Sequence, residues 1–342
     1  MIKIGQIGIG HNHGEGKMLA VRKFPELFEV IGFAEDNEEW IKKRGNLRGY
    51  DGLKRYSTDE LIKKCDALLI ETDVWNLTEI AQKCIDAGKH IHMDKPASGT
   101  LEEYKRVLDG AKAKGLIVQL GYMYRYNPAI QKCFEMIKDG ELGEIVSVNA
   151  EMSTCHSCEY RTWLKNFGGG IMYILGSHLV DLIVYMLGKP EKISSFLKQT
   201  GLDGVEVEDN NLAVLEYKKA LARIFVSSVE VNGWERRQLY VSGSKGTVSI
   251  VPIESPTKMT FSNLKIAQNS YEAVNENVAV EETPMDCRYD SMMQDFYDYI
   301  KGAKENPYTY EHEYAVQEVL DKIVGGVRFF KGENCYESDA CR

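Results

Sequence analysis

Short apolar runs alternate with amphipathic segments from Met1 to about Tyr122, and this order limits the chain to few folds. The strand-like runs cover residues 2–7, 29–34, 67–70, 90–93 and 117–120. Segments with a helical period lie between them, for example 78–87 and 101–113. Buried strands that alternate with helices require a parallel sheet covered on both faces. We therefore expect an α/β fold with a Rossmann-type, doubly wound parallel sheet in an N-terminal domain, residues 1–122.

The pattern changes after residue 122. A helix is predicted from Asn127-Pro128, because proline suits a first helical turn. Alternation with a period of two dominates 145–261, with turns expected at 218–219 and 243–246, and helices return at 289–301 and 313–329. Such strands form an antiparallel sheet with one open face. We expect a second α/β domain, residues 123–342, whose large open, mainly antiparallel sheet joins a homodimer or homotetramer.

Composition and charge argue against several kinds of partner. The 342 residues include 42 Lys and Arg against 51 Asp and Glu, a formal net charge of −9, so no broad basic surface for nucleic acid is expected. The sequence has no apolar stretch of about 20 residues and no leader after Met1, which argues against a membrane span or secretion. Eight cysteines are then expected to be free thiols of a cytoplasmic protein.

The turn after the first strand indicates a nucleotide site. Gly8 and Gly10 would let the backbone approach a pyrophosphate, whose charge meets the N-terminus of the next helix. His13 stands where such turns usually have their third glycine. His11 and His13 could instead bind a metal, but histidines in a glycine turn more often face phosphate or solvent, so no metal is expected. Asn12, between them, belongs to the expected cofactor site.

Two carboxylates follow the second strand. Glu35 and Asp36 lie where a carboxylate accepts hydrogen bonds from ribose hydroxyls, and the register favours Glu35. A carboxylate there repels a 2′-phosphate, and no Arg or Lys follows closely in the sequence. NAD is therefore predicted in preference to NADP. If the two glycines were only structural, these residues would be a solvated acidic turn before a helix at Glu38.

A lysine at another strand end is the first catalytic candidate. Lys95 follows the run 90–93, and side chains at the end of a parallel strand point into the crevice where such sheets bind ligands. A lysine that only extends its ammonium to solvent is the alternative. We favour the functional role, with Asp94 beside it at the cofactor.

Several motifs follow one another along the chain. They are Gly8-Ile-Gly10, Asp94-Lys95-Pro96, Gly121-Tyr-Met-Tyr-Arg125-Tyr-Asn-Pro128, Gly140-Glu-Leu-Gly143, Gly168-Gly-Gly170 and Gly176-Ser-His178-Leu-Val-Asp181. This ordered set resembles the glucose-fructose oxidoreductase / inositol dehydrogenase / rhizopine catabolism (Gfo/Idh/MocA) family over essentially the whole chain. The resemblance implies bound NAD(P) and oxidation or reduction of sugars and cyclic polyols. It also implies that Lys95 contacts cofactor and substrate and that His178 is the active-site histidine.

The chain departs from the family pattern at three places. Asp94 replaces a glutamate, which preserves the charge but shortens the side chain. Ile174 stands where an aspartate is usual, four residues before His178. Residues 72–77 lack the usual Thr-Pro-Asn start and a later histidine. Thr72 and Trp75 are still expected at the cofactor, which Trp75 would cover.

The remaining candidates are expected to line a substrate pocket. His178 lies in 172–187, a run that is apolar on nearly every side and is predicted to be a buried helix. A buried imidazole needs a partner or a cavity, and a core histidine satisfied by Asp181 is the alternative to catalysis. Arg125 could bind substrate hydroxyls or brace the domain junction. Cys155 and Cys158 flank His156 too closely to share one metal ion with it easily. The expected substrate-binding residues are Tyr173, Arg125, Asn127, Asp181 and His156.

The sequence favours an NAD-dependent dehydrogenase that acts on a small-molecule carbohydrate or polyol. His178 would take the proton of a ring hydroxyl, Lys95 would orient that oxygen, and the carbon would pass hydride to nicotinamide. Two alternatives stay open. One is a cofactor-bound sensor or regulatory protein without turnover, prompted by Ile174. The other is a redox glycosidase that uses NAD for a transient oxidation.

Overall fold

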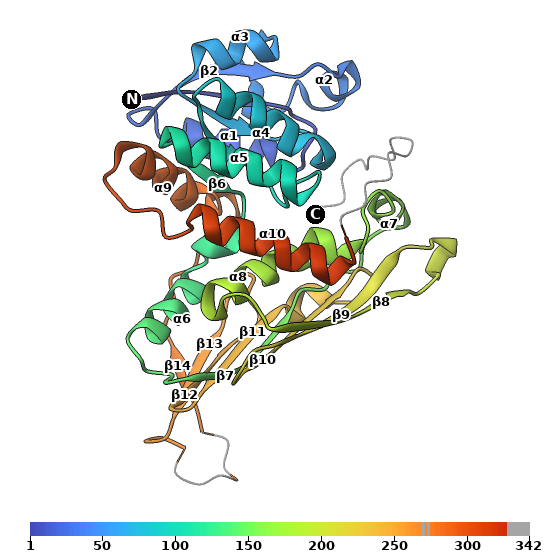
Figure 1. Ribbon diagram of the computed structural model, residues 1–342, viewed down its shortest axis with the longest axis vertical. Coiled ribbons are helices and arrows are strands. Elements are labelled where there is room, and N and C mark those ends of the chain that lie inside the picture. The colour runs from blue at the N-terminus through green and yellow to red at the C-terminus, as the bar shows by residue number, and fades with distance from the viewer. Residues whose placement is uncertain (268–270, 272–273, 327–342) are drawn as a thin grey trace. The chain divides into compact units, whose positions relative to one another are not determined.

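A computed structural model describes residues 1–267, 271 and 274–326 (Figure 1). These residues form two compact units. Unit 1 contains Met1–Tyr126 and Met285–Gln317, and unit 2 contains Asn127–Pro284 and the chain from Glu318. The first change of unit lies four residues after the expected boundary at 122. The return of 285–317 to unit 1 has no counterpart in the sequence pattern.

Unit 1 is built on a six-stranded parallel sheet in the order β3-β2-β1-β4-β5-β6. The strand order reverses between β1 and β4, and ligands of such sheets bind at the carboxyl ends of the strands beside this reversal. All four residues of β4 are buried, as a strand covered by helices on both faces requires. The strands are β1 (Ile2–Ile7), β2 (Phe28–Ala34), β3 (Arg55–Tyr56), β4 (Ala67–Ile70), β5 (His90–Met93) and β6 (Val118–Leu120).

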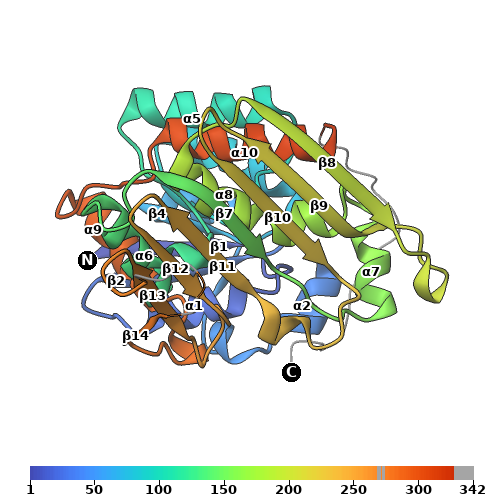
Figure 2. The same ribbon diagram turned by 90° about the horizontal axis from the view of Figure 1, so that it is seen from below.

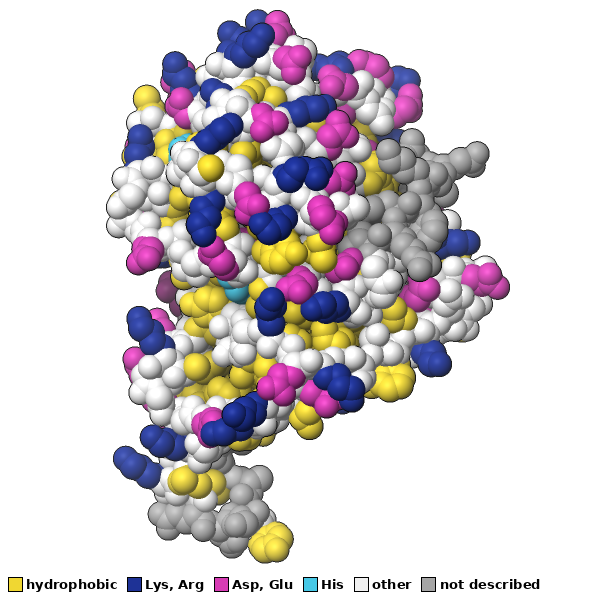
Figure 3. All heavy atoms as spheres, in the orientation of Figure 1, with side chains coloured by type: hydrophobic (Ala, Val, Ile, Leu, Met, Phe, Trp, Pro, Cys, Tyr) yellow, Lys and Arg dark blue, Asp and Glu magenta, His cyan; other side chains and the backbone are white. Residues whose placement is uncertain are grey.

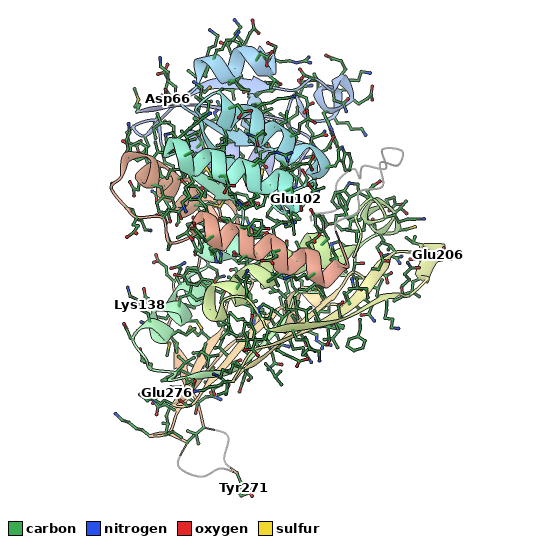
Figure 4. The ribbon with its side chains drawn as sticks, in the orientation of Figure 1. Asp66, Glu102, Lys138, Glu206, Tyr271 and Glu276 are labelled. Carbon is green, nitrogen blue, oxygen red and sulfur yellow. The ribbon has the colours of Figure 1, made fainter. Side chains whose placement is uncertain are left out.

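The helices of unit 1 follow its strands closely. α5 begins after Thr100, whose side chain forms a capping box with Glu103, and the acidic Glu102 lies in the same first turn (Figure 4). The cap fixes the point at which the loop after β5 ends. The helices are α1 (Gly14–Arg22), α2 (Glu38–Arg44), α3 (Thr58–Lys64), α4 (Leu77–Asp86), α5 (Leu101–Lys114) and α9 (Asp290–Lys301), and α10 (Tyr310–Val324) begins in this unit.

Unit 2 contains an eight-stranded sheet in the order β14-β13-β12-β11-β7-β10-β9-β8. Its strands pair antiparallel except β7 and β10, which run parallel. The sheet strands are β7 (Ile145–Glu151), β8 (Lys192–Gln199), β9 (Glu208–Glu216), β10 (Leu221–Ser227), β11 (Gln238–Gly243), β12 (Gly246–Ile250), β13 (Met259–Asn263) and β14 (Glu276–Val278). The helices of this unit include α6 (Pro128–Lys138), α7 (Cys158–Leu164) and α8 (Ser177–Leu187). Figure 2 shows the sheet with α8 behind it.

The predicted fold class is confirmed in both parts. The run 172–187 is helical as expected, but its first turn is a π-helix, η4 (Met172–Gly176). The last predicted helix, 313–329, begins earlier than expected, at Tyr310, and ends at Val324, before the turn at Gly325 and Gly326. Residues 327–329 of the predicted helix lie outside the described residues. No described helix is both long enough and apolar enough to cross a bilayer. On the face in Figure 3, basic and acidic side chains are interspersed.

Candidate functional site

The turn between β1 and α1 fits a dinucleotide. Gly8 has φ +87°, and a Cβ there would lie 2.5 Å from the backbone N and Cα of Thr72, just after β4. Glycine is required for this close approach. A Cβ at Gly10 would lie 2.6 Å from Nε1 of the Trp40 indole, so this position also needs a glycine. α1 begins at Gly14. The turn thus leads the backbone to a helix N-terminus, whose N–H groups suit the pyrophosphate of an NAD-type cofactor.

His11 and His13, in this turn, both contact Asp94 at the end of β5. Asp94 Oδ2 lies 2.9 Å from His11 Nδ1 and 3.0 Å from His13 Nδ1. Asp94 Oδ1 accepts a 2.6 Å hydrogen bond from the Lys95 backbone N–H. His13, which replaces the third glycine of the usual turn, is therefore in direct contact with Asp94, which replaces the family's glutamate.

A buried lysine from α1 joins the same group. Lys17 Nζ lies 2.8 Å from Asp94 Oδ2 and 2.7 Å from Glu71 Oε1, and the three side chains are fully buried. Gly121, just after β6, adjoins this ammonium, because a Cβ there would lie 2.7 Å from Nζ. We use the name Asp94 cluster for the side chains of His11, His13, Lys17, Glu71 and Asp94.

Burial and mutual contacts set the charges of the Asp94 cluster. Burial alone would raise the pKa of Asp94, but His11, Lys17 and His13 hold it well below its usual range. Burial raises the pKa of Glu71 well above its usual range, against the opposing effect of Lys17. Burial would lower the pKa of Lys17, yet Asp94 and Glu71 raise it. Asp94 is therefore the ionised partner of Lys17, and Glu71 is the carboxyl that takes a proton more readily.

The Lys17 ammonium supplies a positive charge inside the Asp94 cluster, where a metal ion would otherwise be considered. His11, His13 and Asp94 present atoms of the kind that bind metals within 4.8 Å of one another. Lys17 already donates to the Asp94 oxygen that both histidines contact. The expectation that this turn binds no metal stays a prediction.

Glu35 ties the end of β2 to the glycine turn. Its Oε2 accepts a hydrogen bond from the Ile9 N–H and its Oε1 accepts one from the Asn37 N–H, both at 2.9 Å. Burial raises the pKa of Glu35, against these two hydrogen bonds, which lower it. Asp36 is exposed and accepts a hydrogen bond from Thr58 Oγ1. Each oxygen of Glu35 retains a second lone pair that a ribose hydroxyl can use.

Two arginines reach this region from more distant parts of the sequence. Arg44, the last residue of α2, donates to the backbone O of His11 at 3.4 Å and contacts the Asn12 side chain. Its guanidinium lies 5.5 Å from the centroid of the Trp40 ring. Arg55, on β3, donates two hydrogen bonds to the backbone O of Glu35, the residue that follows β2. Basic groups are thus nearer to this strand end than the adjacent sequence indicates.

Thr72 and Trp75 follow β4. Thr72 Oγ1 donates a 3.1 Å hydrogen bond to the backbone O of Asp73. The Asp73 carboxylate accepts a 3.4 Å hydrogen bond from Trp40 Nε1. Trp75 is half-buried in the short helix η2 (Val74–Asn76). Trp40, which sequence reasoning did not single out, thus joins the loop after β4 to the glycine turn.

Lys95 lies in the loop between β5 and α5, directly after Asp94, and is 3% exposed. Its backbone N–H is held by Asp94. Farther along the loop, Ser98 and Thr78 exchange two hydrogen bonds of 2.9 Å, each from a backbone N–H to the other's hydroxyl. The loop is therefore fixed at both of these points, which gives Lys95 a defined position at the strand end.

The catalytic candidate of unit 2 lies on the helix after the glycine run 168–170. Tyr173 is in the π turn η4, a type of turn frequent at functional sites. Its ring stacks on Phe167 with centroids 5.8 Å apart. His178 and Asp181 lie near the start of α8 and are 3% and 1% exposed. Residues three apart share a helix face, so both groups project to one side of α8.

His156 lies just before α7 and stacks on Tyr160, with ring centroids 4.1 Å apart and planes at 14°. Burial lowers the pKa of His156 to about 3, and Arg237 and Arg161 act in the same direction. Within the described part of the chain, its buried Nδ1 has no hydrogen-bond partner, and neither has the buried Nε1 of Trp163. Buried polar atoms of this kind beside aromatic rings suit a ligand rich in hydroxyl groups.

Cys155 and Cys158 are both exposed free thiols. Among the residues that the structure describes, they do not form a group with His156 that could hold one metal ion.

Arg125 and Asn127 both have structural partners. The Arg125 guanidinium forms two hydrogen bonds with the Glu313 carboxylate, 2.6 and 2.8 Å long, in a buried ion pair. Its guanidinium carbon also lies 3.9 Å from the Tyr308 ring centroid. The Asn127 side chain caps α6 and donates to the backbone O of Ile253. These contacts give Arg125 a structural role within unit 1. Bracing of the domain junction by Arg125 and substrate binding by either side chain stay predictions.

Sequence reasoning missed Lys17, Glu71 and Trp163. Glu71 directly follows the buried run 67–70, and Lys17 lies one helical turn after His13. Both positions could therefore have been predicted near the cofactor from the sequence. A charged residue that directly follows a buried parallel strand lies at the ligand-binding edge of the sheet. Trp163 had no comparable signal, because its importance comes from an indole nitrogen that only the packing leaves unpaired.

Comparison with known proteins gives matches over both units. The oxidoreductase family with an NAD-binding Rossmann fold matches residues 2–122, and the Gfo/Idh/MocA C-terminal domain matches 130–249. An uncharacterized oxidoreductase of Schizosaccharomyces pombe is 28% identical over 240 residues, 66% of this chain and 64% of that protein. The scyllo-inositol 2-dehydrogenase (NADP(+)) IolW of Bacillus subtilis is 25% identical over 243 residues, 70% of this chain and 66% of that protein. The chain thus spans slightly less than two thirds of either relative's length.

A solved structure shares the fold. Levoglucosan dehydrogenase, in a complex with NADH and levoglucosan, has a TM-score of 0.79 at 18% identity, covering 95% of this chain and 96% of that chain. Identity at this level speaks for the fold alone. The two family matches lie one after the other along the sequence, in the order that the motifs predicted. The chain therefore belongs to the Gfo/Idh/MocA family of oxidoreductases.

Proposed function

We propose that this protein is an NAD-dependent oxidoreductase that transfers hydride between nicotinamide and a hydroxyl of a sugar, sugar derivative or cyclic polyol. The observation that carries this proposal is the glycine turn at Gly8 together with Lys95, buried and fixed after β5 of the same sheet. The relatives support the substrate class, since their names include an inositol dehydrogenase and a levoglucosan dehydrogenase.

Each candidate residue has a defined task in this reaction. In the oxidative direction His178 accepts the proton of the substrate hydroxyl, and Lys95 orients the oxygen. Bound NAD supplies the hydride acceptor. Asp94 positions Lys95 through its backbone N–H, and Tyr173, His156 and Asp181 bind other substrate hydroxyls. In reduction Lys95 polarises the carbonyl and His178 returns the proton.

An activity screen tests this function. NADH formation is followed by absorbance with a panel of sugars, inositols and glycosides as substrates. NADH produced with at least one sugar or polyol supports the dehydrogenase. Tight NAD binding without turnover on any member would favour a sensor, and release of a free sugar without net NADH would favour a redox glycosidase.

The free cysteines indicate the cellular compartment in which we expect the protein. The described thiols Cys65, Cys84, Cys133, Cys155, Cys158 and Cys287 are free, and two of them are exposed. Exposed free thiols suit a reducing compartment, so a cytoplasmic location is part of the proposal. Cys335 and Cys341 lie outside the described residues.

Glu35 is expected to make NAD bind more tightly than NADP, because a carboxylate at the ribose repels a 2′-phosphate. Relatives use either cofactor: IolW is named for NADP(+), and the levoglucosan dehydrogenase structure contains NADH. Fluorescence titration of both cofactors measures the preference. Glu35→Ala should weaken NAD binding and relax the discrimination.

Arg55 provides the control for this prediction. It bonds the backbone O of Glu35 and pairs with Glu38 at 2.8 Å, so its charge is already engaged. Arg55→Ala should therefore leave the preference for NAD unchanged. Stronger NADP binding that disappears in Arg55→Ala would show instead that Arg55 holds the 2′-phosphate, and the ribose role of Glu35 would be wrong.

The open face of the unit 2 sheet is proposed to join subunits into a homodimer or homotetramer. Phe196 on β8 pairs with Leu212 on β9, which pairs with Phe225 on β10, so one apolar row crosses three strands. Phe196 and Leu221 are 53% and 56% exposed. Residues of the alternate set, such as Leu215, are buried on the other face. An apolar row of this kind on an open sheet is typical of a contact surface.

The oligomer prediction is tested by light scattering. We expect a mass of two or four times the 38.8 kDa of one chain. The double variant Phe196→Glu, Leu212→Glu should dissociate to monomers, because it places charges in the apolar row. Leu264→Glu, at a 70% exposed position outside the row, is the matched control and should not dissociate. A wild-type mass of one chain would contradict the prediction.

A further inference from the structure

Two cations reach the glycine turn, one from the interior and one from near the surface. The interior cation is Lys17, whose side chain is 0% exposed and pairs with Glu71 and Asp94. The other is Arg44, which is half-buried and contacts the side chain of Asn12, an exposed residue of the turn. A cofactor can approach the turn only from its exposed side. Of these two cations, Arg44 is therefore the one that an incoming phosphate can contact.

Neutral groups of the turn position the Arg44 side chain. It donates to the backbone O of His11 at 3.4 Å and to the side-chain amide O of Asn12. Its guanidinium carbon lies 5.5 Å from the centroid of the Trp40 ring, and the same indole adjoins Gly10. A hydrogen bond between two charged groups is roughly twice as strong as one between neutral groups. A phosphate oxygen at Arg44 is therefore bound more strongly than the amide that it replaces.

The carboxyl groups around the turn make a cation necessary for a phosphate ligand. The ionised Asp94 contacts the turn from β5, Glu35 and Asp36 follow β2, and Asp73 follows β4. Burial raises the pKa of Glu35, and Asp73 and Asp36 also raise it, so these groups are close enough to interact. A pyrophosphate brings further negative charge to this place, and like charges repel. Arg44 supplies the opposite charge on the exposed side of the turn.

We propose that Arg44 binds the pyrophosphate of the dinucleotide and neutralises part of its charge. This inference rests on the proposed function, because it takes the glycine turn as the cofactor site. On binding, a phosphate oxygen replaces the Asn12 amide as a partner of the guanidinium. NAD and NADP share the pyrophosphate, so Arg44 raises the affinity for both. The choice between them remains with the carboxylate of Glu35.

Fluorescence titration of NAD, NADP and ADP tests the inference, because all three contain a pyrophosphate. Arg44→Gln removes the charge and should weaken the binding of each ligand by about 10- to 100-fold, the usual effect of losing a hydrogen bond to a charged group. Arg44→Lys keeps the charge and should retain most of the affinity. Added NaCl should weaken NAD binding more steeply in the wild-type protein than in Arg44→Gln, because salt screens the ion pair.

Lys42→Gln is the matched control, since it removes one positive charge from the same helix at a side chain that is 70% exposed, and it should bind like the wild-type protein. Wild-type NAD affinity in Arg44→Gln would overturn the inference and leave the proposed function standing. An equal loss in Arg44→Lys would overturn it too, because the charge would not matter. So would a loss confined to NADP, which would assign Arg44 to the 2′-phosphate. If the wild-type protein bound none of the three ligands, the inference and the proposed function would both fail.

Discussion

Lys95→Ala and His178→Ala are each expected to lower turnover by roughly 10²- to 10⁴-fold, the effect of losing a positioned acid–base or electrophilic group. Lys95 is buried at a fixed strand end, and His178 is buried near the start of α8. NAD affinity should change much less than turnover. Steady-state rates with a substrate from the activity screen, together with NAD titration, separate the two effects.

Controls for these variants come from the same protein. Lys105→Ala removes a lysine whose side chain is 54% exposed on α5 and should leave turnover unchanged. Ile174→Asp should not raise turnover if the π turn needs no carboxylate; a rise would show that the pocket has lost a catalytic group. Near-wild-type turnover in both alanine variants would overturn the mechanism and favour the sensor.

Lys17→Met is expected to lower the free energy of unfolding of unit 1 by about 3–5 kcal/mol, the usual result of removing one partner of a buried ion pair. Lys17, Glu71 and Asp94 are fully buried, so water cannot replace the missing ammonium. This loss is a large part of the roughly 5–15 kcal/mol that stabilises a typical protein. Urea unfolding followed by tryptophan fluorescence, with Trp40 in the same unit, measures it.

A second substitution identifies the cause of the destabilisation. The double variant Lys17→Met, Glu71→Gln should recover part of the lost stability, because it removes one of the two carboxyl groups left without a cation. Lys42→Met, at a side chain that is 70% exposed, is the surface control and should unfold like the wild-type protein. A Lys17→Met variant as stable as this control would show that the Asp94 cluster does not need its ammonium.

The sheet of unit 1 could be predicted almost to the residue. The run 67–70 is apolar because both faces of a parallel strand are buried, and it matches β4 in the structure. The predicted strand 90–93 matches β5. β3 escaped prediction because Arg55–Tyr56 is too short to show a period. The return of 285–317 to unit 1 depends on long-range packing, which leaves no local pattern.

Sequence reasoning pointed to some residues of the candidate site but not to their contacts, and it missed Lys17 and Glu71. His11, His13 and Asp94 were each expected at the cofactor from the turn and the strand end. Their mutual contact depends on the three-dimensional placement of the glycine turn and the β5 end, which are far apart in the sequence. Arg44 was overlooked for the same reason, since it reaches the turn across α2.

The ion pair between Arg125 and Glu313 has a consequence for synthesis on the ribosome. The two residues are 188 positions apart, and Glu313 belongs to the segment that returns to unit 1. The nascent Rossmann sheet therefore emerges long before the carboxylate that neutralises Arg125. Domains generally fold as they emerge, N-terminal first. Unit 1 is an exception to that order, because it can be completed only after the segment 285–317 has been translated, later than most of unit 2.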